Sequence, residues 1–145
     1  MTTSSYSPLP LPAGISESYI KTDDLTYHIL EAGHDDNSRK PLILLLHGFP
    51  ELAFSWRKIM PSLAASSGYH VVAYDQRGYG RTTGWDMRPF SQVDLKTFAF
   101  SRIVTDAIRL VFALGYKEAR CVVGHDFGAV GASFCALARP DIFKR

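Results

Sequence analysis

Cysteine is scarce in this sequence and long apolar runs are absent, and these two shortages exclude several classes of protein. Only Cys121 and Cys135 are cysteines among 145 residues, so a disulfide-stapled scaffold is excluded. We expect both to be free thiols in a reducing compartment. The longest apolar run, residues 42–46, is far below the roughly 20 residues that a membrane-spanning helix needs. We therefore expect no membrane span.

An excess of charge of one sign is also missing. The 16 Lys and Arg residues and the 14 Asp and Glu residues are spread along the chain and give a formal net charge of +2. No basic stripe is available for a phosphate backbone, so we expect no nucleic-acid partner. Residues 1–12 have neither the basic start nor the apolar centre of a secretory signal. These observations predict a cytoplasmic protein.

What the sequence does contain is an ordinary globular composition, with 46% hydrophobic and 21% charged residues. Residues 1–16, rich in serine and proline at their start, are predicted to form a loose arm, and residues 17–145 to form one core domain. Residues 18–21 and 25–30 are predicted to form two strands of an antiparallel ribbon. Residues 42–46, 69–74 and 120–123 are apolar with little alternation, which is typical of strands buried on both faces of a parallel sheet.

Helical patterns separate these strands. The first spans about residues 55–64, with Ser55 as its cap and a bend at Pro61. The second spans residues 100–112, with Arg102 and Asp106 paired on its polar side. A third follows residue 126, and its large apolar side chains are expected to be buried: Phe127, Val130, Phe134 and Leu137. The alternation of strands and helices predicts an α/β fold with a mostly parallel sheet and flanking helices.

The most informative motif is Gly-His-Asp-Phe-Gly at residues 124–128, between a predicted strand and a predicted helix. Its spacing is that of a nucleophile elbow, a sharp turn that holds its central residue in strained backbone geometry. Gly124 and Gly128 supply the small flanks that such a turn requires. We expect the Asp126 carboxylate to project as a nucleophile from the C-terminal edge of the sheet. A carboxylate there predicts attack on alkyl carbon rather than direct acyl transfer.

A second motif, His-Gly-Phe-Pro at residues 47–50, directly follows the longest apolar run. In an open parallel sheet this position lies at the C-terminal end of a strand, where ligands bind. An elbow takes its oxyanion hole from the N–H after the nucleophile and from an N–H in the loop after the third strand. We therefore predict that the backbone N–H groups of Phe49 and Phe127 form the hole. The expected supporting residues are His47, Gly48, Pro50, Gly124, His125 and Gly128.

Each motif also has a purely structural interpretation. Aspartate is a favoured N-cap, so Asp126 could simply cap the helix that follows it. The segment at residues 47–50 could be an ordinary tight turn. The presence of both motifs in one chain favours catalysis. His125 lies next to the nucleophile and would point elsewhere, so we expect a structural role for it rather than that of a general base.

These motifs, with Ser-Trp-Arg at residues 55–57 and Asp-Gln-Arg-Gly-Tyr-Gly at residues 75–80, resemble those of the soluble epoxide hydrolases. These enzymes belong to the aspartate-nucleophile branch of the α/β-hydrolase superfamily. The similarity covers about residues 18–145. It implies that Asp126 opens an epoxide to give an alkyl ester, which a histidine-activated water then hydrolyses. The implied partners are a small-molecule epoxide and water, with no cofactor and no metal.

The other members of the expected catalytic set are missing from the sequence. In this fold an acid and then a histidine follow the nucleophile. None of the 19 residues after Asp126 is a histidine, and Asp141 is the only acid among them. The helical cap that the resemblance implies, with tyrosines that protonate the epoxide oxygen, is also absent. We interpret the chain as an N-terminal fragment of an α/β-hydrolase core, truncated after the helix that follows the elbow and unable to complete turnover alone.

Other interpretations stay open. A haloalkane dehalogenase uses the same aspartate, although Phe127 lacks the indole N–H that commonly holds the halide there. The chain could also be a non-catalytic fragment or binding module of the same fold. Truncation would leave the strand before Asp126 at the edge of the sheet. An uncovered apolar edge predicts self-association or marginal stability.

Overall fold

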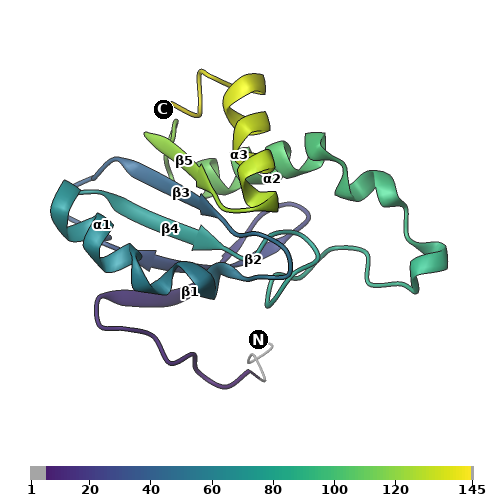
Figure 1. Ribbon diagram of the computed structural model, residues 1–145, viewed down its shortest axis with the longest axis horizontal. Coiled ribbons are helices and arrows are strands. Elements are labelled where there is room, and N and C mark those ends of the chain that lie inside the picture. Colours follow the sequence, from purple (N-terminus) through teal and green to yellow (C-terminus); the bar gives the residue numbers. More distant parts are fainter. Residues whose placement is uncertain (1–5, 145) are drawn as a thin grey trace.

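The computed structural model describes residues 6–144 and shows one five-stranded sheet with helices packed on both sides (Figure 1). The strands are β1 (Ile15–Lys21), β2 (Thr26–Ala32), β3 (Leu42–Leu46), β4 (His70–Tyr74) and β5 (Cys121–Gly124). The α-helices are α1 (Met60–Ser67), α2 (Phe100–Ala113) and α3 (Phe127–Ala138). Short 3₁₀ helices are η1 (Ala53–Lys58), η2 (Phe90–Gln92) and η3 (Leu95–Phe98).

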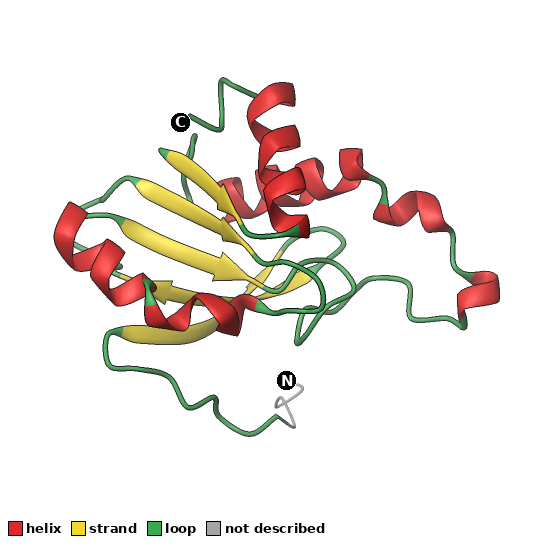
Figure 2. Ribbon diagram, in the orientation of Figure 1, coloured by secondary structure: helices red, strands yellow, loops and turns green. Residues whose placement is uncertain are grey.

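The strand order is β1-β2-β4-β3-β5. Strands β4, β3 and β5 run parallel, and Leu44 of β3 pairs with Val72 on one side and Val122 on the other. Strands β1 and β2 form the expected antiparallel ribbon, which joins the sheet through β2 and β4. The predicted α/β architecture is thus confirmed, and β5 lies at an edge of the sheet, as predicted (Figure 2).

The burial of β3 explains why its sequence does not alternate. Leu42, Leu44 and Leu46 belong to a core cluster with side chains of α2 and α3. Ile43 and Leu45 belong to a second cluster, on the other face, with side chains of α1. All five are buried, so each face of the strand must be apolar.

Between β3 and β4 the structure differs from the single bent helix that the sequence predicts. Separate helices η1 and α1 meet at Ile59, and Ser55 lies inside η1 instead of capping a helix. Pro61 lies in the first turn of α1, where its missing N–H removes no intrahelical hydrogen bond. Proline therefore begins this helix instead of bending it.

The predicted pair of Arg102 and Asp106 on the polar side of α2 is also wrong. Asp106 is buried and accepts two hydrogen bonds from Arg77, each 2.8 Å long. Arg102 instead lies 3.5 Å from a carboxylate oxygen of Asp24. The planar Arg77 fork offers Asp106 two charge-assisted bonds in a buried setting, which a surface pair one helical turn away cannot match.

Helix α3 turns the opposite face to the sheet from the one expected. Its large apolar residues are exposed: Phe127 by 44%, Val130 by 40%, Phe134 by 41% and Leu137 by 80%. Its buried residues are small: Gly128, Gly131, Ala132 and Cys135. The hydrophobic spacing identified the helix but not its buried face, because close approach to β3 selects for small side chains over large ones.

The N-terminal segment makes more contacts than a loose arm would. Residues 1–5 of the predicted arm lie outside the described residues, and β1 already begins at Ile15. Leu9 and Leu11 pack against the α1-side cluster, and the Ser7 carbonyl oxygen accepts a hydrogen bond from Arg81. Within residues 6–144 no helix has the length and apolar character needed to cross a bilayer.

Candidate active site

The backbone at Asp126 is the most strained point in the described chain. Its φ is 53° and its ψ is −123°, and no other non-glycine residue between 6 and 144 has a positive φ. Such geometry costs on the order of 1–3 kcal/mol and persists only where surrounding structure enforces it. The strand β5 ends at Gly124 and α3 begins at Phe127, so the turn between them is as sharp as the elbow motif predicts.

Close packing around this turn explains the flanking glycines. A Cβ atom on Gly124 would lie 2.1 Å from the carbonyl oxygen of Gly128. A Cβ atom on Gly128 would lie 2.3 Å from the carbonyl oxygen of Leu46 in β3. These distances are far inside van der Waals contact, so any larger residue would push α3 away from β3 and β5.

The loop after β3 meets the carboxylate of Asp126 directly. The backbone N–H of Phe49 donates a 3.0 Å hydrogen bond to Oδ2 of Asp126. Gly48 lies so close that an added Cβ would be 2.7 Å from the Asp126 Cβ. The hydrogen bond from the Phe49 N–H, and to a smaller extent that from the Phe127 N–H, holds the pKa of Asp126 below its ordinary value of 3.8. The exposed carboxylate is therefore ionised at neutral pH.

His47 braces this loop from the buried side. Its Nε2 accepts a 3.0 Å hydrogen bond from the backbone N–H of Gln76, which leaves Nδ1 to donate to the Gly48 carbonyl oxygen at 2.9 Å. The Gln76 side chain returns a 2.7 Å bond to the His47 carbonyl oxygen. Burial lowers the pKa of His47 below 6.5, which keeps the ring neutral and able to accept. Sequence reasoning missed this role of Gln76, because Gln76 follows β4 and its partner His47 follows β3.

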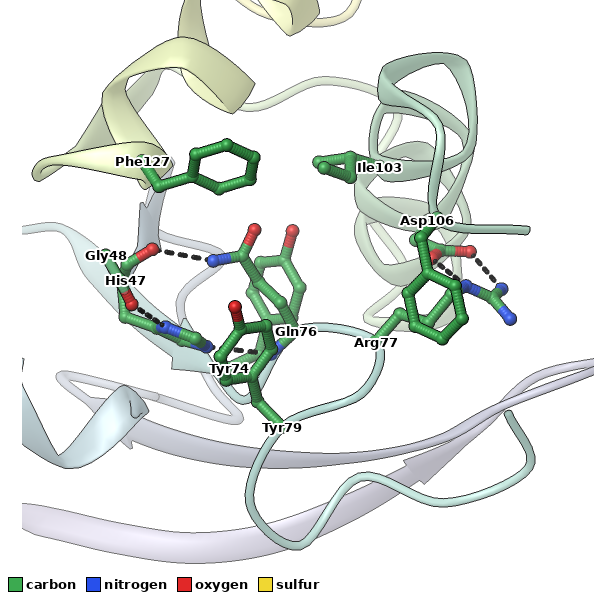
Figure 3. Close-up of a pocket in the computed structure, with 10 residues that line it drawn as sticks. His47, Gly48, Tyr74, Gln76, Arg77, Tyr79, Ile103, Asp106 and Phe127 are labelled. Carbon is green, nitrogen blue, oxygen red and sulfur yellow. Dashed lines mark hydrogen bonds and ion pairs between the residues drawn. The ribbon is translucent and has the colours of Figure 1, made fainter. Parts of the chain in front are cut away.

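A cavity of about 230 Å³ opens beside these groups (Figure 3). Gly48 and Phe127, the neighbours of the reactive turn, line it together with the rings of Tyr74 and Tyr79. Ile103 closes the far side, as Figure 3 shows. The Tyr74 hydroxyl is buried and has no hydrogen-bond partner within residues 6–144. The cavity wall is thus apolar over most of its area, but it also includes His47, Gln76 and the ion pair of Arg77 and Asp106.

None of the histidines in the described chain contacts Asp126 as a general base would. His125 is exposed and its Nδ1 lies 3.2 Å from Glu51 Oε2, on the side of the elbow away from this cavity. His28 and His70 are both 2% exposed. His28 is held between Glu17 and Asp75, with contacts of 2.9 and 2.7 Å. Within the described chain, no imidazole is hydrogen-bonded to Asp126.

The family model for the alpha/beta hydrolase fold matches residues 41–145, which contain β3, β4, β5 and the elbow. The chain belongs to the alpha/beta hydrolase fold family. Within this family it is similar to named epoxide hydrolases. It is 36% identical over 134 residues to an epoxide hydrolase of Caballeronia sordidicola, covering 92% of this chain and 36% of that protein. It is 39% identical over 115 residues to epoxide hydrolase A of Mycobacterium tuberculosis, covering 79% of this chain and 32% of that protein.

Solved structures of alpha/beta hydrolases show the same likeness. An epoxide hydrolase from an endophytic Streptomyces superimposes with a TM-score of 0.75 at 37% identity, covering 91% of this chain and 36% of that one. Epoxide hydrolase A of Mycobacterium thermoresistibile gives 0.75 at 36% identity, covering 89% and 37%. The chain thus spans about a third of the length of the relatives that it matches. The relatives favour the epoxide hydrolase resemblance over that to haloalkane dehalogenases.

Proposed function

We propose that this chain carries the nucleophile half of an epoxide-opening active site. The observation that supports this most directly is the hydrogen bond from the Phe49 N–H to Oδ2 of Asp126, on a strained turn at the C-terminal edge of the sheet. An aspartate that only capped α3 would direct its side chain at the helix, but no such cap bond forms here. The carboxylate instead accepts a hydrogen bond from the loop that follows β3.

The geometry divides the work between the two carboxylate oxygens. Oδ2 is held by the Phe49 N–H, so Oδ1 is the oxygen that attacks an epoxide carbon. The new O–C bond forms as one C–O bond of the ring breaks, and the alkoxide that results stays attached to the substrate and takes a proton from an acid or from solvent. Asp126 needs no base for this step because it is already ionised. The apolar walls beside Gly48 and Phe127 suit the carbon skeleton of the substrate.

The second half-reaction places charge on the oxygen already bound by the loop. Water gives a proton to a base and adds to the ester carbonyl carbon of Asp126, and the negative charge develops on Oδ2, facing the N–H groups of Phe49 and Phe127. Collapse of this intermediate breaks the bond between that carbon and Oδ1, which takes up a proton and leaves in the diol, and the carboxylate is restored. Removal of one such donor costs about 3 kcal/mol of transition-state stabilisation in other hydrolases. We assign the base that activates this water, and the acid that protonates the alkoxide, to groups that the 145-residue chain does not contain.

Trapping of the ester tests this proposal. Incubation of the chain with a reactive epoxide such as styrene oxide should give an adduct on Asp126, because no base is present to hydrolyse it. Peptide mass analysis would locate the added mass. Asp126→Asn, which is close to isosteric, is the matched control and should give no adduct at that position. An unmodified Asp126 in a folded sample would overturn the assignment and favour a non-catalytic module.

We further propose a reducing, cytoplasmic location for the protein. Cys121 and Cys135 are free thiols, and free thiols persist in reducing compartments. A fluorescent fusion in the source cell should be found in the cytoplasm, and recovery of the protein with oxidised thiols outside it would contradict this.

We also propose that the edge strand β5 and the exposed apolar side chains of α3 promote self-association.

A further inference from the structure

Three side chains that can bind metal lie together where β4 begins, at the opposite end of the parallel strands from Asp126. Glu31 lies in β2, His34 follows in the next loop, and His70 begins β4. One ligand atom from each lies within 4.8 Å of the other two. Asp126 follows the C-terminal end of β5, and β5 runs parallel to β3 and β4. The N-terminal residue of β4 is therefore at the far edge, away from the proposed nucleophile.

Strand register and one glycine bring these residues together. Glu31 pairs with Val72 across the antiparallel β2 and β4, so His70 is its diagonal neighbour on the same face. Oε2 of Glu31 and Nε2 of His70 are 3.0 Å apart. Gly33 has a φ of 76°, and a Cβ there would lie 2.4 Å from the Tyr69 carbonyl oxygen. Only glycine fits this turn, which places the His34 ring 5.0 Å from the His70 ring, measured between centroids.

Each imidazole has one nitrogen whose partner lies outside this group of three residues. His70 has a side chain only 3% exposed, and its Nδ1 lies 2.9 Å from the Tyr116 hydroxyl. Nε2 of His34 lies 3.0 Å from Oδ1 of Asp36, and its Nδ1 has no hydrogen bond within the described chain. A metal-binding histidine ordinarily has its second nitrogen held in this way by a carboxylate, carbonyl or other polar group.

We propose that Glu31, His34 and His70 form a Zn²⁺ site that ties the loop after β2 to the sheet. Two imidazoles and one carboxylate are a donor set that Zn²⁺ binds, and three protein ligands leave the fourth position to water. Bonds of about 2.1 Å in tetrahedral geometry place ligand atoms about 3.4 Å apart. Oε2 of Glu31 and Nε2 of His70 are 3.0 Å apart, so they must separate slightly as bonds to the ion replace their hydrogen bond, and His34 must adjust its position to meet the same ion. His34 can supply this movement because its side chain is 55% exposed.

The charged side chains around the proposed site include both signs, so together they do not repel a cation. Arg39 and Lys40 line the adjoining cavity of about 290 Å³, but Asp35 and Asp36 line it as well. Arg39 donates to the Gly115 carbonyl oxygen and lies over the Tyr116 ring at 5.2 Å from its centroid. A Glu carboxylate is ordinarily ionised at neutral pH, as metal binding requires.

Metal titration of the chain, freed of any affinity tag, tests the site. Co²⁺ serves as the spectroscopic probe, and the expected result is one equivalent bound with the visible absorption of a four-coordinate ion, displaced by Zn²⁺. One equivalent of Zn²⁺ should also raise the melting temperature, because an ion that binds only the folded chain stabilises it. No Co²⁺ or Zn²⁺ binding by the folded chain up to about 1 mM would overturn the proposal.

Three variants separate this site from adventitious binding. His34→Gln and Glu31→Gln should each weaken Co²⁺ binding by more than about 10-fold, the loss that follows even from removal of an outer partner. His125→Gln is the matched control, since His125 is exposed and lies 3.2 Å from a carboxylate but belongs to no group of three ligands within residues 6–144. It should leave Co²⁺ affinity unchanged. Equal losses in all three variants, or none in His34→Gln, would contradict the assignment. His34 is exposed, so circular dichroism should show an intact fold in that variant.

Discussion

The carboxylate of Asp126, the proposed nucleophile, is held by backbone groups and not by another side chain. The backbone N–H groups of Phe49 and Phe127 favour the ionised form of its carboxylate. The positive φ of Asp126 is a strained conformation that the surrounding structure must hold. The sequence predicted this residue and both donors, because the elbow spacing fixes which backbone N–H groups face the central residue. It did not predict the His47–Gln76 brace, since that contact depends on where β4 lies beside β3.

The lowered pKa of Asp126 predicts how adduct formation depends on pH. Only the carboxylate attacks, so the rate of epoxide addition should be flat from neutral pH down to about pH 4 and fall only below the ordinary carboxyl value of 3.8. Quenched-flow or timed mass analysis with an acid-stable epoxide would give this profile. A midpoint above pH 5 would contradict the role of the two N–H groups, as would a profile unaffected by Asp126→Asn.

The buried His47 predicts a loss of stability in mild acid. The unfolded imidazole takes up a proton below its ordinary pKa of 6.5, whereas the folded one takes it up only at lower pH. Its contribution is therefore present above pH 6.5 and is lost as the pH falls below it, by at most about 1.4 kcal/mol per pH unit. Urea melts between pH 7.5 and 5.5 would measure the slope. His47→Gln should flatten it and the exposed His34→Gln should not; equal slopes in all three proteins would contradict this account.

At the scale of elements, the approach of α3 to β3 decides the geometry of the elbow. The helix lies against the strand through glycine and alanine, so its backbone N–H groups reach the edge where Asp126 stands. The sequence predicted the helix but placed its large side chains inward. Hydrophobic spacing alone does not identify the buried face when both faces of a helix are apolar, because then packing distance decides.

Two glycines of α3 provide a matched pair of substitutions. Gly128→Ala would place a Cβ 2.3 Å from the Leu46 carbonyl oxygen, whereas Gly131→Ala would place one 3.1 Å from a Leu46 methyl group, which can move. We expect Gly128→Ala to lower the free energy of unfolding by about 1–3 kcal/mol and to abolish adduct formation at Asp126. Gly131→Ala should change the free energy of unfolding by less than about 1 kcal/mol, since the higher helix propensity of alanine offsets the crowding. Denaturant melts would compare them, and similar losses would contradict the close-approach argument.

For the whole molecule, the sheet ends at β5 and the outer face of α3 is uncovered. Phe100 stacks on Phe134 with ring centroids 4.7 Å apart, and Leu137 is 80% exposed beyond them. Adjacent exposed apolar side chains beside an open strand edge favour association with another copy or with further chain. The relatives, which are about three times longer, have much additional structure that this chain lacks.

Self-association of the isolated chain should therefore depend on this face. We expect light scattering to show dimers or larger species at micromolar concentration, and Leu137→Lys to shift the population toward monomer. Leu95→Lys is the matched control, because Leu95 is also exposed but lies in η3, away from α3. A monomeric wild-type chain with a cooperative melt would contradict the prediction, as would equal effects of the two substitutions.

The fold class, the positions of β3, β4 and β5 and the sharp turn at Asp126 could be predicted from the sequence, because they follow from local patterns: unbroken apolar runs and glycines at fixed spacing. Burial on both faces was right for β3 and β4 but wrong for β5, whose four residues are only partly buried at the edge of the sheet. The tertiary structure was needed to show which face of α3 is buried, that Asp106 pairs with Arg77, and that His34 and His70 meet beside Glu31. Those contacts join residues tens of positions apart. Strand order and register place them together, and neither can be read from the spacing within one segment.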